Sequence, residues 1–534
     1  MLPLTKTGVF VNYTDLRIRN PNVEKQTLIA QRIANHFSLT HVPPVGPVKR
    51  HKCVKWSRKD RRLILPRFCT EVLNSKFMLH DYEIASQLSA GDKLTADIKF
   101  TGALTENQTV IFNHIQEKYY TPEKVSSGQA GLILNLEAGQ GKTYLAAYFI
   151  SVIKRKTAVI LHSTSILEQW RRALIKCYPG LRIGAYYSDE KTDGDVVLMI
   201  INSAGSTEFT TNGTTVPALD YYNRFGFVIF DECHVYCNDL GSKAFTKAQA
   251  PYMLGLSATP EENANNFDKI IQWNIGPILN AAELPGYKTS TNKFTGLVYK
   301  VKYSAKPEYS KVLKSGTGMI SVSSTISMLC EDPDRLAVVV ECVMRCLRSS
   351  LNVFVFCDRR TYAAEIIRVL NDKHHVLGFV LDSEADFMRI VGGTSDEDMQ
   401  LAEEKARVVA TTYQYMGTGK SIGKMNGLVL ATPRKSKMEQ YIKRIFRLGS
   451  DESVTRQIYD VVDQKVAVKS QWYHRKKYYD QMGYPIEDLP ATDLVADQKP
   501  QTPDQTQAQD VPEVKSQIRQ MSALASKLLD KLKK

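Results

Sequence analysis

Short apolar runs recur along this chain of 534 residues, and they restrict its fold more than any other feature of the sequence. Each run is rich in β-branched or aromatic residues, and segments with helical periodicity separate one run from the next. Strands that are apolar throughout are buried on both faces, and strands that alternate with helices build parallel sheets. The pattern predicts an α/β fold with two tandem domains, each a parallel sheet flanked by helices. The two series of runs lie at 131–136, 157–162, 195–201, 225–230 and 252–258, and at 352–357, 406–412, 426–432 and 456–462.

Changes in composition predict where the domains begin and end. We expect an N-terminal accessory domain at 1–98, the first α/β domain at 99–285 and the second at 286–484. Residues 485–515 contain five prolines, many Gln and Asp and almost no large apolar residue, which is typical of a disordered linker. In 516–534, apolar residues recur at spacings of three and four, which predicts an amphipathic helix with a basic opposite face. Such a helix binds a protein partner, self-associates, contacts nucleic acid or docks on the chain's own core.

The chain carries 70 Lys and Arg residues against 56 Asp and Glu residues, a formal net charge of +14. A surplus of cations favours polyanionic partners, of which nucleic acid is the commonest. Cations are dense at 49–62, where His51 and Trp56 stand among them. This stretch is either a nucleic-acid contact or a solvated basic surface.

The sequence also bears on where the protein acts. Its apolar runs fall far short of the ~18–20 residues of a membrane span, and the N-terminus shows no secretory signal pattern. Nine cysteines, an odd number scattered along the chain, suit a reducing compartment better than a disulfide framework. We therefore expect an intracellular, cytoplasmic protein with no membrane partner.

The segment Leu136-Glu-Ala-Gly-Gln-Gly-Lys-Thr143 has the pattern of a phosphate-binding loop. It follows an apolar run and precedes an apolar helical segment, which is the strand–loop–helix context that such a loop requires. Leu136 stands where a small residue is usual, and a second Gly-Lys-Ser at 419–421 is rejected because no apolar helix follows it. Backbone N–H groups and the lysine contact phosphates, and the following hydroxyl ligates Mg²⁺. The predicted nucleotide contacts are Gly139, Gln140, Gly141, Lys142 and Thr143.

An acidic pair, Asp231 and Glu232, follows the run at 225–230 within the sequence Asp-Glu-Cys-His. A carboxylate at the end of a strand beside a phosphate loop is placed to hold Mg²⁺, so Asp231 and Thr143 are the predicted metal ligands. Glu232 is the candidate general base that orients and deprotonates the attacking water, and the alternative is that the pair caps a helix. Ser257-Ala-Thr259 follows the next run and is informative only in this order and spacing.

The order Gly-x-Gly-Lys-Thr, Asp-Glu-Cys-His, Ser-Ala-Thr resembles motifs I, II and III of superfamily 2 helicases and translocases of the DExH kind. The segment 157–170, which ends in Leu-Glu-Gln-Trp, resembles motif Ia of one branch of that superfamily. The branch includes the transcription-repair helicase XPB, the phage branch-migration helicase UvsW and the poxvirus transcript-release helicase. Residues 352–360, 411–419 and 440–447 are similar to motifs IV, V and VI, and motif V looks most like that of members from large DNA viruses.

This resemblance implies two RecA-like domains with ATP bound between them. Arg444 and Arg447 would reach the γ-phosphate from the second domain as arginine fingers, and Gln440 would help to place them. Two departures from the family stand in these motifs: Lys443 replaces the usual Gly of motif VI, and Lys-Ser at 420–421 replaces the usual Leu-Asp of motif V.

The resemblance also implies coupling and binding roles. His234, Ser257 and Thr259 would couple the phosphate state to domain closure. Gln108 lies where this branch reads adenine and would pair with the base, although the Arg and Tyr of that segment are missing. The residues at family positions that grip the nucleic-acid backbone are Ser163, Ser203, Arg359 and Thr411.

The resemblance predicts a nucleic-acid-stimulated ATPase that uses ATP and Mg²⁺ as a DNA helicase or translocase on duplex or branched DNA, in recombination, repair or transcript release. An RNA helicase of the DExH type is the nearest alternative, and the Leu-Glu-Gln-Trp segment favours the DNA-acting branch. A catalytically silent scaffold that only binds nucleic acid has no need of Lys142, Asp231, Glu232, Arg444 and Arg447 together. A viral member of the family would act in the host cytoplasm or the virion.

Overall fold

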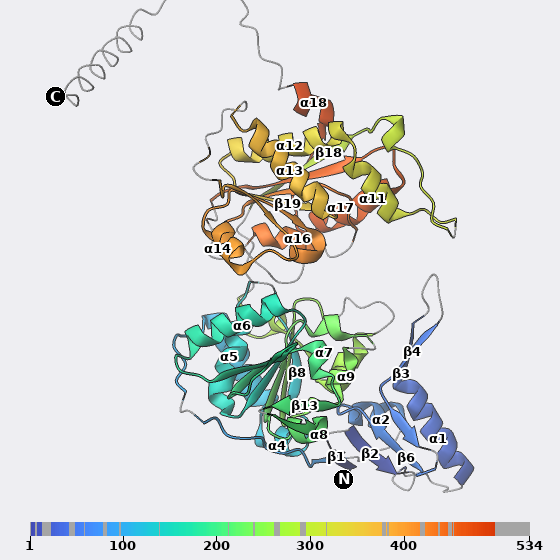
Figure 1. The fold of residues 1–534 in the computed structure, drawn as a ribbon. Coiled ribbons are helices and arrows are strands. Elements are labelled where there is room, and N and C mark those ends of the chain that lie inside the picture. The colour runs from blue at the N-terminus through green and yellow to red at the C-terminus, as the bar shows by residue number, and fades with distance from the viewer. Residues whose placement is uncertain are drawn as a thin grey trace, which may run out of the picture.

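Figure 1 shows the computed structural model of the chain, in which an N-terminal domain lies beside the first of two larger lobes. The predicted residue Arg447, residues 417–421 of motif V, and residues 497–534, with most of the expected linker and the expected terminal helix, lie outside the described residues. The structure describes residues 2–496 apart from gaps at 6–7, 13–15, 17–22, 42–47, 58, 78–82, 96–97, 138, 212, 239–240, 261–266, 289–294, 317, 376–380, 382–383, 417–421, 436–437, 447–450 and 452.

The N-terminal domain contains a five-stranded sheet in the order β5-β6-β2-β1-β7 and a separate hairpin, β3–β4. Its strand pairs are antiparallel except that β7 runs parallel to β1. The basic stretch at 49–62 supplies β4, β5 and the start of β6, with Arg50, Lys52 and Lys55 exposed. The elements are β1 (Leu2–Thr5), β2 (Gly8–Asn12), α1 (Val23–His36), β3 (Ser38–His41), β4 (Lys49–Lys52), β5 (Lys55–Ser57), β6 (Arg62–Leu65), α2 (Thr70–Lys76) and β7 (Ile84–Ser86).

The N-terminal domain shares a hydrophobic core with the first lobe. Buried residues of its sheet and helices form one cluster with residues on one face of the lobe 1 sheet. Phe37 packs edge-on against Trp273 of lobe 1, with ring centroids 5.0 Å apart. The guanidinium of Arg67, a residue 1% exposed, donates hydrogen bonds to three carbonyl oxygens of lobe 1, those of Gly128, Ala250 and Pro251. The domain is therefore fixed to lobe 1 by packing and by buried hydrogen bonds.

Lobe 1 contains an eight-stranded sheet in the order β11-β10-β12-β9-β15-β16-β8-β17, parallel apart from the short β10–β11 pair. A separate hydrophobic cluster lies on each face of the sheet. The helices are α3 (Glu106–Lys118), α4 (Pro122–Ser126), α5 (Lys142–Ile153), α6 (Thr164–Cys177), α7 (Ile201–Ala204), α8 (Ala218–Tyr222), α9 (Ser242–Phe245), α10 (Lys269–Asn274), and the 3₁₀ turns η2 (Cys233–Tyr236) and η4 (Ala281–Glu283). The strands are β8 (Gly131–Asn135), β9 (Thr157–Leu161), β10 (Ile183–Tyr187), β11 (Glu190–Lys191), β12 (Val196–Ile200), β15 (Phe227–Phe230), β16 (Tyr252–Ser257) and β17 (Ile278–Asn280), with a hairpin of β13 (Glu208–Thr211) and β14 (Thr214–Pro217) outside the sheet.

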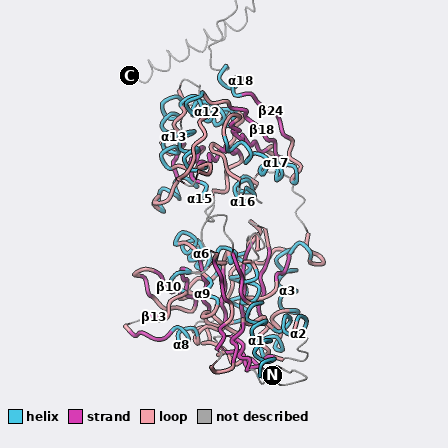
Figure 2. The backbone as a smooth tube through the Cα atoms, turned by 90° about the vertical axis from the view of Figure 1, so that its right-hand side faces the viewer, coloured by secondary structure: helices cyan, strands magenta, loops and turns pink. Residues whose placement is uncertain are grey.

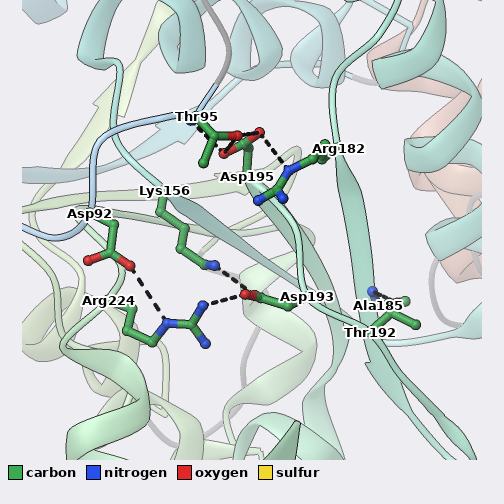
Figure 3. A network of polar contacts seen from close by, with 9 residues as sticks. All are labelled: Asp92, Thr95, Lys156, Arg182, Ala185, Thr192, Asp193, Asp195 and Arg224. Atoms are coloured by element: carbon green, nitrogen blue, oxygen red, sulfur yellow. Dashed lines mark hydrogen bonds and ion pairs between the residues drawn. The ribbon is translucent and has the colours of Figure 1, made fainter. Parts of the chain in front are cut away.

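A polar network ties the segment that enters lobe 1 to the amino-terminal side of the lobe 1 sheet (Figure 3). The Asp193 carboxylate lies 2.6 Å from the Lys156 ammonium and also pairs with Arg224. The buried Asp195 carboxylate accepts from the Thr95 hydroxyl at 2.7 Å and from the Thr95 backbone N–H at 2.8 Å. Because Thr95 lies between the N-terminal domain and lobe 1, these contacts fix the connection at the edge opposite to the one where the strands end.

Lobe 2 contains a seven-stranded sheet in the order β20-β21-β19-β22-β23-β18-β24, and each described neighbouring pair is parallel. In Figures 1 and 2, α16 lies on the side of lobe 2 that faces lobe 1. The strands are β18 (Gly296–Tyr303), β19 (Val353–Cys357), β20 (Phe387–Ile390), β21 (Val408–Thr412), β22 (Gly427–Leu430), β23 (Arg456–Asp463) and β24 (Ile486–Pro490). The helices are α11 (Val322–Cys330), α12 (Pro333–Arg348), α13 (Arg360–Lys373), α14 (Asp396–Glu404), α15 (Tyr413–Met416), α16 (Met438–Ile442), α17 (Gln471–Gln481), α18 (Ala491–Ala496), and the 3₁₀ turns η5 (Pro307–Tyr309), η6 (Lys443–Ile445) and η7 (Ala467–Ser470).

The predicted fold class, two tandem α/β units with parallel sheets, is confirmed. Every apolar run of the sequence forms a strand, β8, β9, β12, β15 and β16 in lobe 1 and β19, β21, β22 and β23 in lobe 2. The expected domain limits after residues 98 and 285 fall in connecting segments, not in helices or strands. None of the helices that the structure describes has both the length and the apolar character needed to cross a membrane.

The expected linker is wrong for its first residues, 485–496. β24 extends the lobe 2 sheet by pairing in parallel with β18, and α18 follows it. Leu494 of α18 is fully buried in a lobe 2 hydrophobic cluster. An edge strand has a neighbour on one side only, so it tolerates the acidic residues and prolines that composition assigns to a linker. Lobe 2 therefore continues to Ala496.

Arg67 allows a test of how the N-terminal domain is attached. We expect Arg67→Ala to lower the free energy of unfolding by about 3–5 kcal/mol, because it leaves buried carbonyl oxygens without donors. Arg62→Ala is the matched control, since Arg62 is exposed and its ion pair with the exposed Asp60 is 3.6 Å long. Chemical denaturation measures both variants, and equal stabilities would contradict the role given to Arg67.

Two truncations test the correction at the C-terminal side of lobe 2. A chain that ends after residue 484 loses β24 and the buried Leu494, so we expect its unfolding free energy to fall by about 2 kcal/mol or more. A chain that ends after Ala496 keeps both elements and should melt at the temperature of the full chain. Melting curves followed by circular dichroism compare the two, and identical curves would contradict the assignment of β24 and α18 to the lobe 2 fold.

Candidate active site

The predicted phosphate loop lies between β8 and α5, at the carboxyl edge of the lobe 1 sheet. Gly139 and Gly141 have φ of +85° and +76°, a backbone region that favours glycine. A Cβ on Gly139 would meet no atom within 4 Å, so the loop is open above this residue. The Lys142 ammonium donates to the carbonyl oxygen of Leu136 at 2.9 Å, which places it across the loop. The two left-handed glycines and the position of Lys142 are those expected of a phosphate-binding loop.

Gln108, predicted to read adenine, lies at the start of α3 with its side chain 5% exposed. It forms a reciprocal capping box with Thr105, in which each side chain bonds the other residue's backbone. Its Nε2 also lies 3.4 Å from the carbonyl oxygen of Gln140 and 3.3 Å from that of Gly141. The observed role of Gln108 is to brace the phosphate loop, and its contact with a base stays a prediction.

The acidic pair follows β15, the next strand but one from β8 in the sheet. Asp231 is 7% exposed, and its Oδ2 accepts a hydrogen bond from the indole N–H of the buried Trp170 at 2.8 Å. Its Oδ1 accepts from the backbone N–H of Glu232 at 3.1 Å. Glu232 adopts φ +47°, a strained conformation for a residue with a Cβ. The strand and the indole therefore hold Asp231 in one orientation.

The donor set around Asp231 suits a divalent cation. Burial raises the pKa of Asp231 to about 6, and the neighbouring charge of Glu232 adds to the shift. A bound cation would offset both causes of the raised pKa, because it replaces water around the Asp231 carboxylate and reduces the repulsion between Asp231 and Glu232. Carboxylate and hydroxyl oxygens are the ligands that Mg²⁺ takes from proteins, and Asp231 and Thr143 supply these two types.

The residues predicted to couple phosphate state to closure lie in one chain of contacts. His234 Nδ1 lies 2.9 Å from the hydroxyl of Ser257 at the end of β16, and 3.4 Å from Oε2 of Glu232. The Ser257 hydroxyl in turn accepts from the backbone N–H of Thr259 at 3.0 Å. A displacement of Glu232 would therefore reach the segment after β16 through His234.

Lobe 2 presents the described part of motif VI toward this site. Gln440 lies half-buried in α16, and Arg444, 7% exposed, lies in η6 directly after it. Lys443 extends across to lobe 1, where its ammonium lies 3.0 Å from a carboxylate oxygen of Glu137 in the phosphate loop. Motif VI and the phosphate loop thus meet in this structure through Lys443.

The residues expected to contact a nucleic-acid backbone differ in accessibility. Ser163 caps α6, Ser203 lies in the short α7, and Arg359 donates to the hydroxyls of two serines of α11. Thr411 is fully buried in β21, so its side chain reaches no ligand at the surface in this conformation. The contact of Thr411 with a nucleic-acid backbone stays a prediction.

Two contacts of the site were missed by sequence reasoning. The segment Leu-Glu-Gln-Trp indicates the family, but its sequence does not show that the indole of Trp170 donates a hydrogen bond to Asp231. Lys443 was noted only as a departure from motif VI, since no local signal pairs it with Glu137 more than 300 residues away.

A protein-family model described as "Type III restriction enzyme, res subunit" matches residues 101–262. A protein of African swine fever virus (isolate Pig/Kenya/KEN-50/1950), named "Putative ATP-dependent RNA helicase QP509L", is 29% identical over 401 residues, covering 71% of this chain and 75% of the viral protein. The "DNA 3'-5' translocase XPB2" of Sulfurisphaera tokodaii is 27% identical over 206 residues, covering 38% of this chain and 42% of that protein. The crystal structure of T4 UvsW aligns with 87% of this chain and 96% of its own, at 14% identity and a TM-score of 0.34. These sequence relatives confirm the resemblance of the chain to superfamily 2 helicases of the XPB- and UvsW-like branch, including those of large DNA viruses.

Proposed function

We propose that the chain is a helicase, a nucleic-acid-stimulated ATPase that translocates on or unwinds duplex or branched DNA. One observation carries the proposal. β8, β16 and β15 are adjacent parallel strands, and their carboxyl ends bring Lys142, Ser257 and the Asp231–Glu232 pair to one edge of the sheet. Lys443 and Arg444 of lobe 2 stand at the same cleft, because Lys443 contacts the phosphate loop. A scaffold without catalysis would not need acids, lysine and arginine from two lobes around one loop.

The phosphate loop would bind the triphosphate. The open backbone over Gly139 and the N-terminus of α5 favour an anion, and the Lys142 ammonium would leave the Leu136 carbonyl for the β- and γ-phosphates. Asp231 and Thr143 would hold Mg²⁺, which neutralises charge on the phosphate oxygens when bound. The strained backbone of Glu232 and its neighbour His234 keep the Glu232 carboxylate oriented as the base for the attacking water.

Arg444 and Arg447 would approach the γ-phosphate from lobe 2, with Gln440 placing them. Because Arg444 directly follows Lys443, which contacts the phosphate loop, closure of the lobes would bring Arg444 toward the phosphate. His234, Ser257 and Thr259 would transmit the loss of the γ-phosphate to the segment after β16. ATP binding and hydrolysis would then alternate between closed and open lobes.

DNA would cross the surface that carries Ser163, Ser203 and Arg359. Beside Ser203, Lys247 donates to the carbonyl oxygens of Gly205 and Ser206, and it lies near Lys243 and the N-terminal domain's Lys55. Burial and these two cations lower the pKa of Lys247, as expected where like charges gather. The N-terminal domain would thus extend a basic surface from lobe 1, which suits contacts to a phosphate backbone and not to base edges.

The choice between DNA and RNA rests on the Leu-Glu-Gln-Trp segment, which favours the DNA-acting branch. The name of the XPB2 relative agrees with DNA, whereas the African swine fever virus relative is named as an RNA helicase. An RNA helicase is therefore the second candidate. ATPase measurements with duplex, forked and single-stranded DNA beside the matching RNAs decide between them, and stimulation by RNA alone would overturn the DNA assignment.

Glu232→Gln tests the catalytic assignment. It should reduce kcat for ATP by about 10²–10⁴-fold, because the amide cannot take a proton from water, while nucleotide binding is retained. Stimulated phosphate release and the Kd of a fluorescent ATP analogue measure the two effects. Glu331→Gln, on an exposed residue at the end of α11, is the matched control. Full hydrolysis by Glu232→Gln would contradict the role of Glu232.

Trp170→Phe tests how Asp231 is positioned. The phenyl ring keeps most of the packing but removes the N–H that bonds Oδ2, so we expect about tenfold weaker binding of the nucleotide in the presence of Mg²⁺. Binding of the nucleotide with the metal chelated should change much less. Trp472→Phe in lobe 2, another buried indole, is the control. Equal losses with and without Mg²⁺ would show that Trp170 acts only through packing.

A further inference from the structure

Lys443 places its ammonium between two carboxylates, one from each lobe. Glu439, one helical turn earlier, lies 2.7 Å away, and Glu137 of lobe 1 lies 3.0 Å away. The Lys443 side chain is 20% exposed. Burial opposes its charge, but the carboxylates of Glu439 and Glu137 outweigh burial and raise the pKa of Lys443. Lys443 therefore keeps its positive charge at neutral pH and shares it between the two carboxylates.

Glu137 lies inside the phosphate loop, next to Leu136, whose carbonyl oxygen accepts from Lys142. Burial raises the pKa of Tyr287 in lobe 1 and of Tyr478 in lobe 2, and the charge of Glu137 contributes to both shifts. The carboxylate thus lies where the two lobes meet. A carboxylate at this place repels the polyphosphate of a nucleotide unless a cation offsets it.

The residues at positions 137 and 443 are explained together by their opposite charges. Motif VI of the family that the chain resembles has Gly at the position of Lys443, and Gly offers nothing to a carboxylate across the cleft. Glu137 occupies one of the variable positions of the phosphate-loop pattern, where an acid is not required. The chain therefore carries an acid beside the phosphates and a compensating cation that reaches it from the other lobe.

We propose that Lys443 is a positioning residue that neutralises Glu137 beside the ATP phosphates and joins the phosphate loop to lobe 2. The inference rests on the proposed ATP site, because the charge of Glu137 affects affinity only if a nucleotide binds there. Glu137 is 63% exposed, so the pair is partly screened and its effect is a few-fold change in affinity that weakens with salt.

A double-mutant cycle in the full chain tests the pair, with Lys443→Gln, Glu137→Gln and the combined variant. Lys443→Gln should raise the Kd of a fluorescent ATP analogue and the KM for ATP about three- to fivefold, with a much smaller change in kcat. Adding Glu137→Gln should return both values close to those of the wild type, because it removes the charge that Lys443 offsets. Lys443→Arg, which keeps the charge, should retain the wild-type Kd.

Lys476→Gln is the matched control, since Lys476 pairs with Asp480 on α17 at 2.7 Å and is not expected to change nucleotide affinity. If the two substitutions add without rescue, the proposed pairing is overturned. A Kd raised together with a lowered melting temperature, and not corrected by Glu137→Gln, would show a structural role and also overturn it. If the wild-type chain binds no ATP at all, the proposed function fails, which is a different result.

Discussion

Parallel strands deliver the loops that follow them to one edge of a sheet, and the chemistry proposed for lobe 1 depends on this constraint. β15, β16 and β8 are neighbours in the sheet, so the acidic pair, Ser257 and the phosphate loop are brought together although Lys142 and Ser257 lie more than 100 residues apart. The same crowding buries Asp231 and makes its charge costly. The hydrogen bond from the Trp170 indole offsets part of that cost, and a bound divalent cation would offset more of it.

The hydrophobic clusters divide the molecule into two units that could move relative to each other, as the proposed function requires. The N-terminal domain and lobe 1 share a hydrophobic core and the buried hydrogen bonds of Arg67, so they move as one body. Among the described residues, lobe 2 has three hydrophobic clusters of its own, and it meets the phosphate loop through the partly exposed pair of Lys443 and Glu137. A contact of this kind is weak enough to break and re-form as the nucleotide changes, whereas the core of the first body is not.

The nine strands that the sequence predicted are apolar enough to be recognised without their partners, whereas β10, β17, β18 and β20 of the same sheets were not predicted. β24 was missed because its sequence, Ile-Glu-Asp-Leu-Pro, has the composition of a linker, and only pairing with β18 nearly 190 residues earlier makes it a strand. The residue types of the site were also predictable, since the phosphate loop and the acidic pair follow recognised strands. The partners of those residues were not, because Trp170, Lys443 and the bracing contacts of Gln108 depend on long-range geometry that spacing does not reveal.

In the proposed function, nucleotide binding between the lobes and nucleic-acid binding across them share one conformational change, the opening and closing of the lobes. The most direct measurement is the reciprocal linkage between the two ligands at fixed salt. A non-hydrolysable ATP analogue should change the Kd for forked DNA by about tenfold relative to ADP, and DNA should change the relative affinity for the two nucleotides by the same factor. Affinities for DNA that are the same with the ATP analogue, with ADP and without nucleotide would contradict the account.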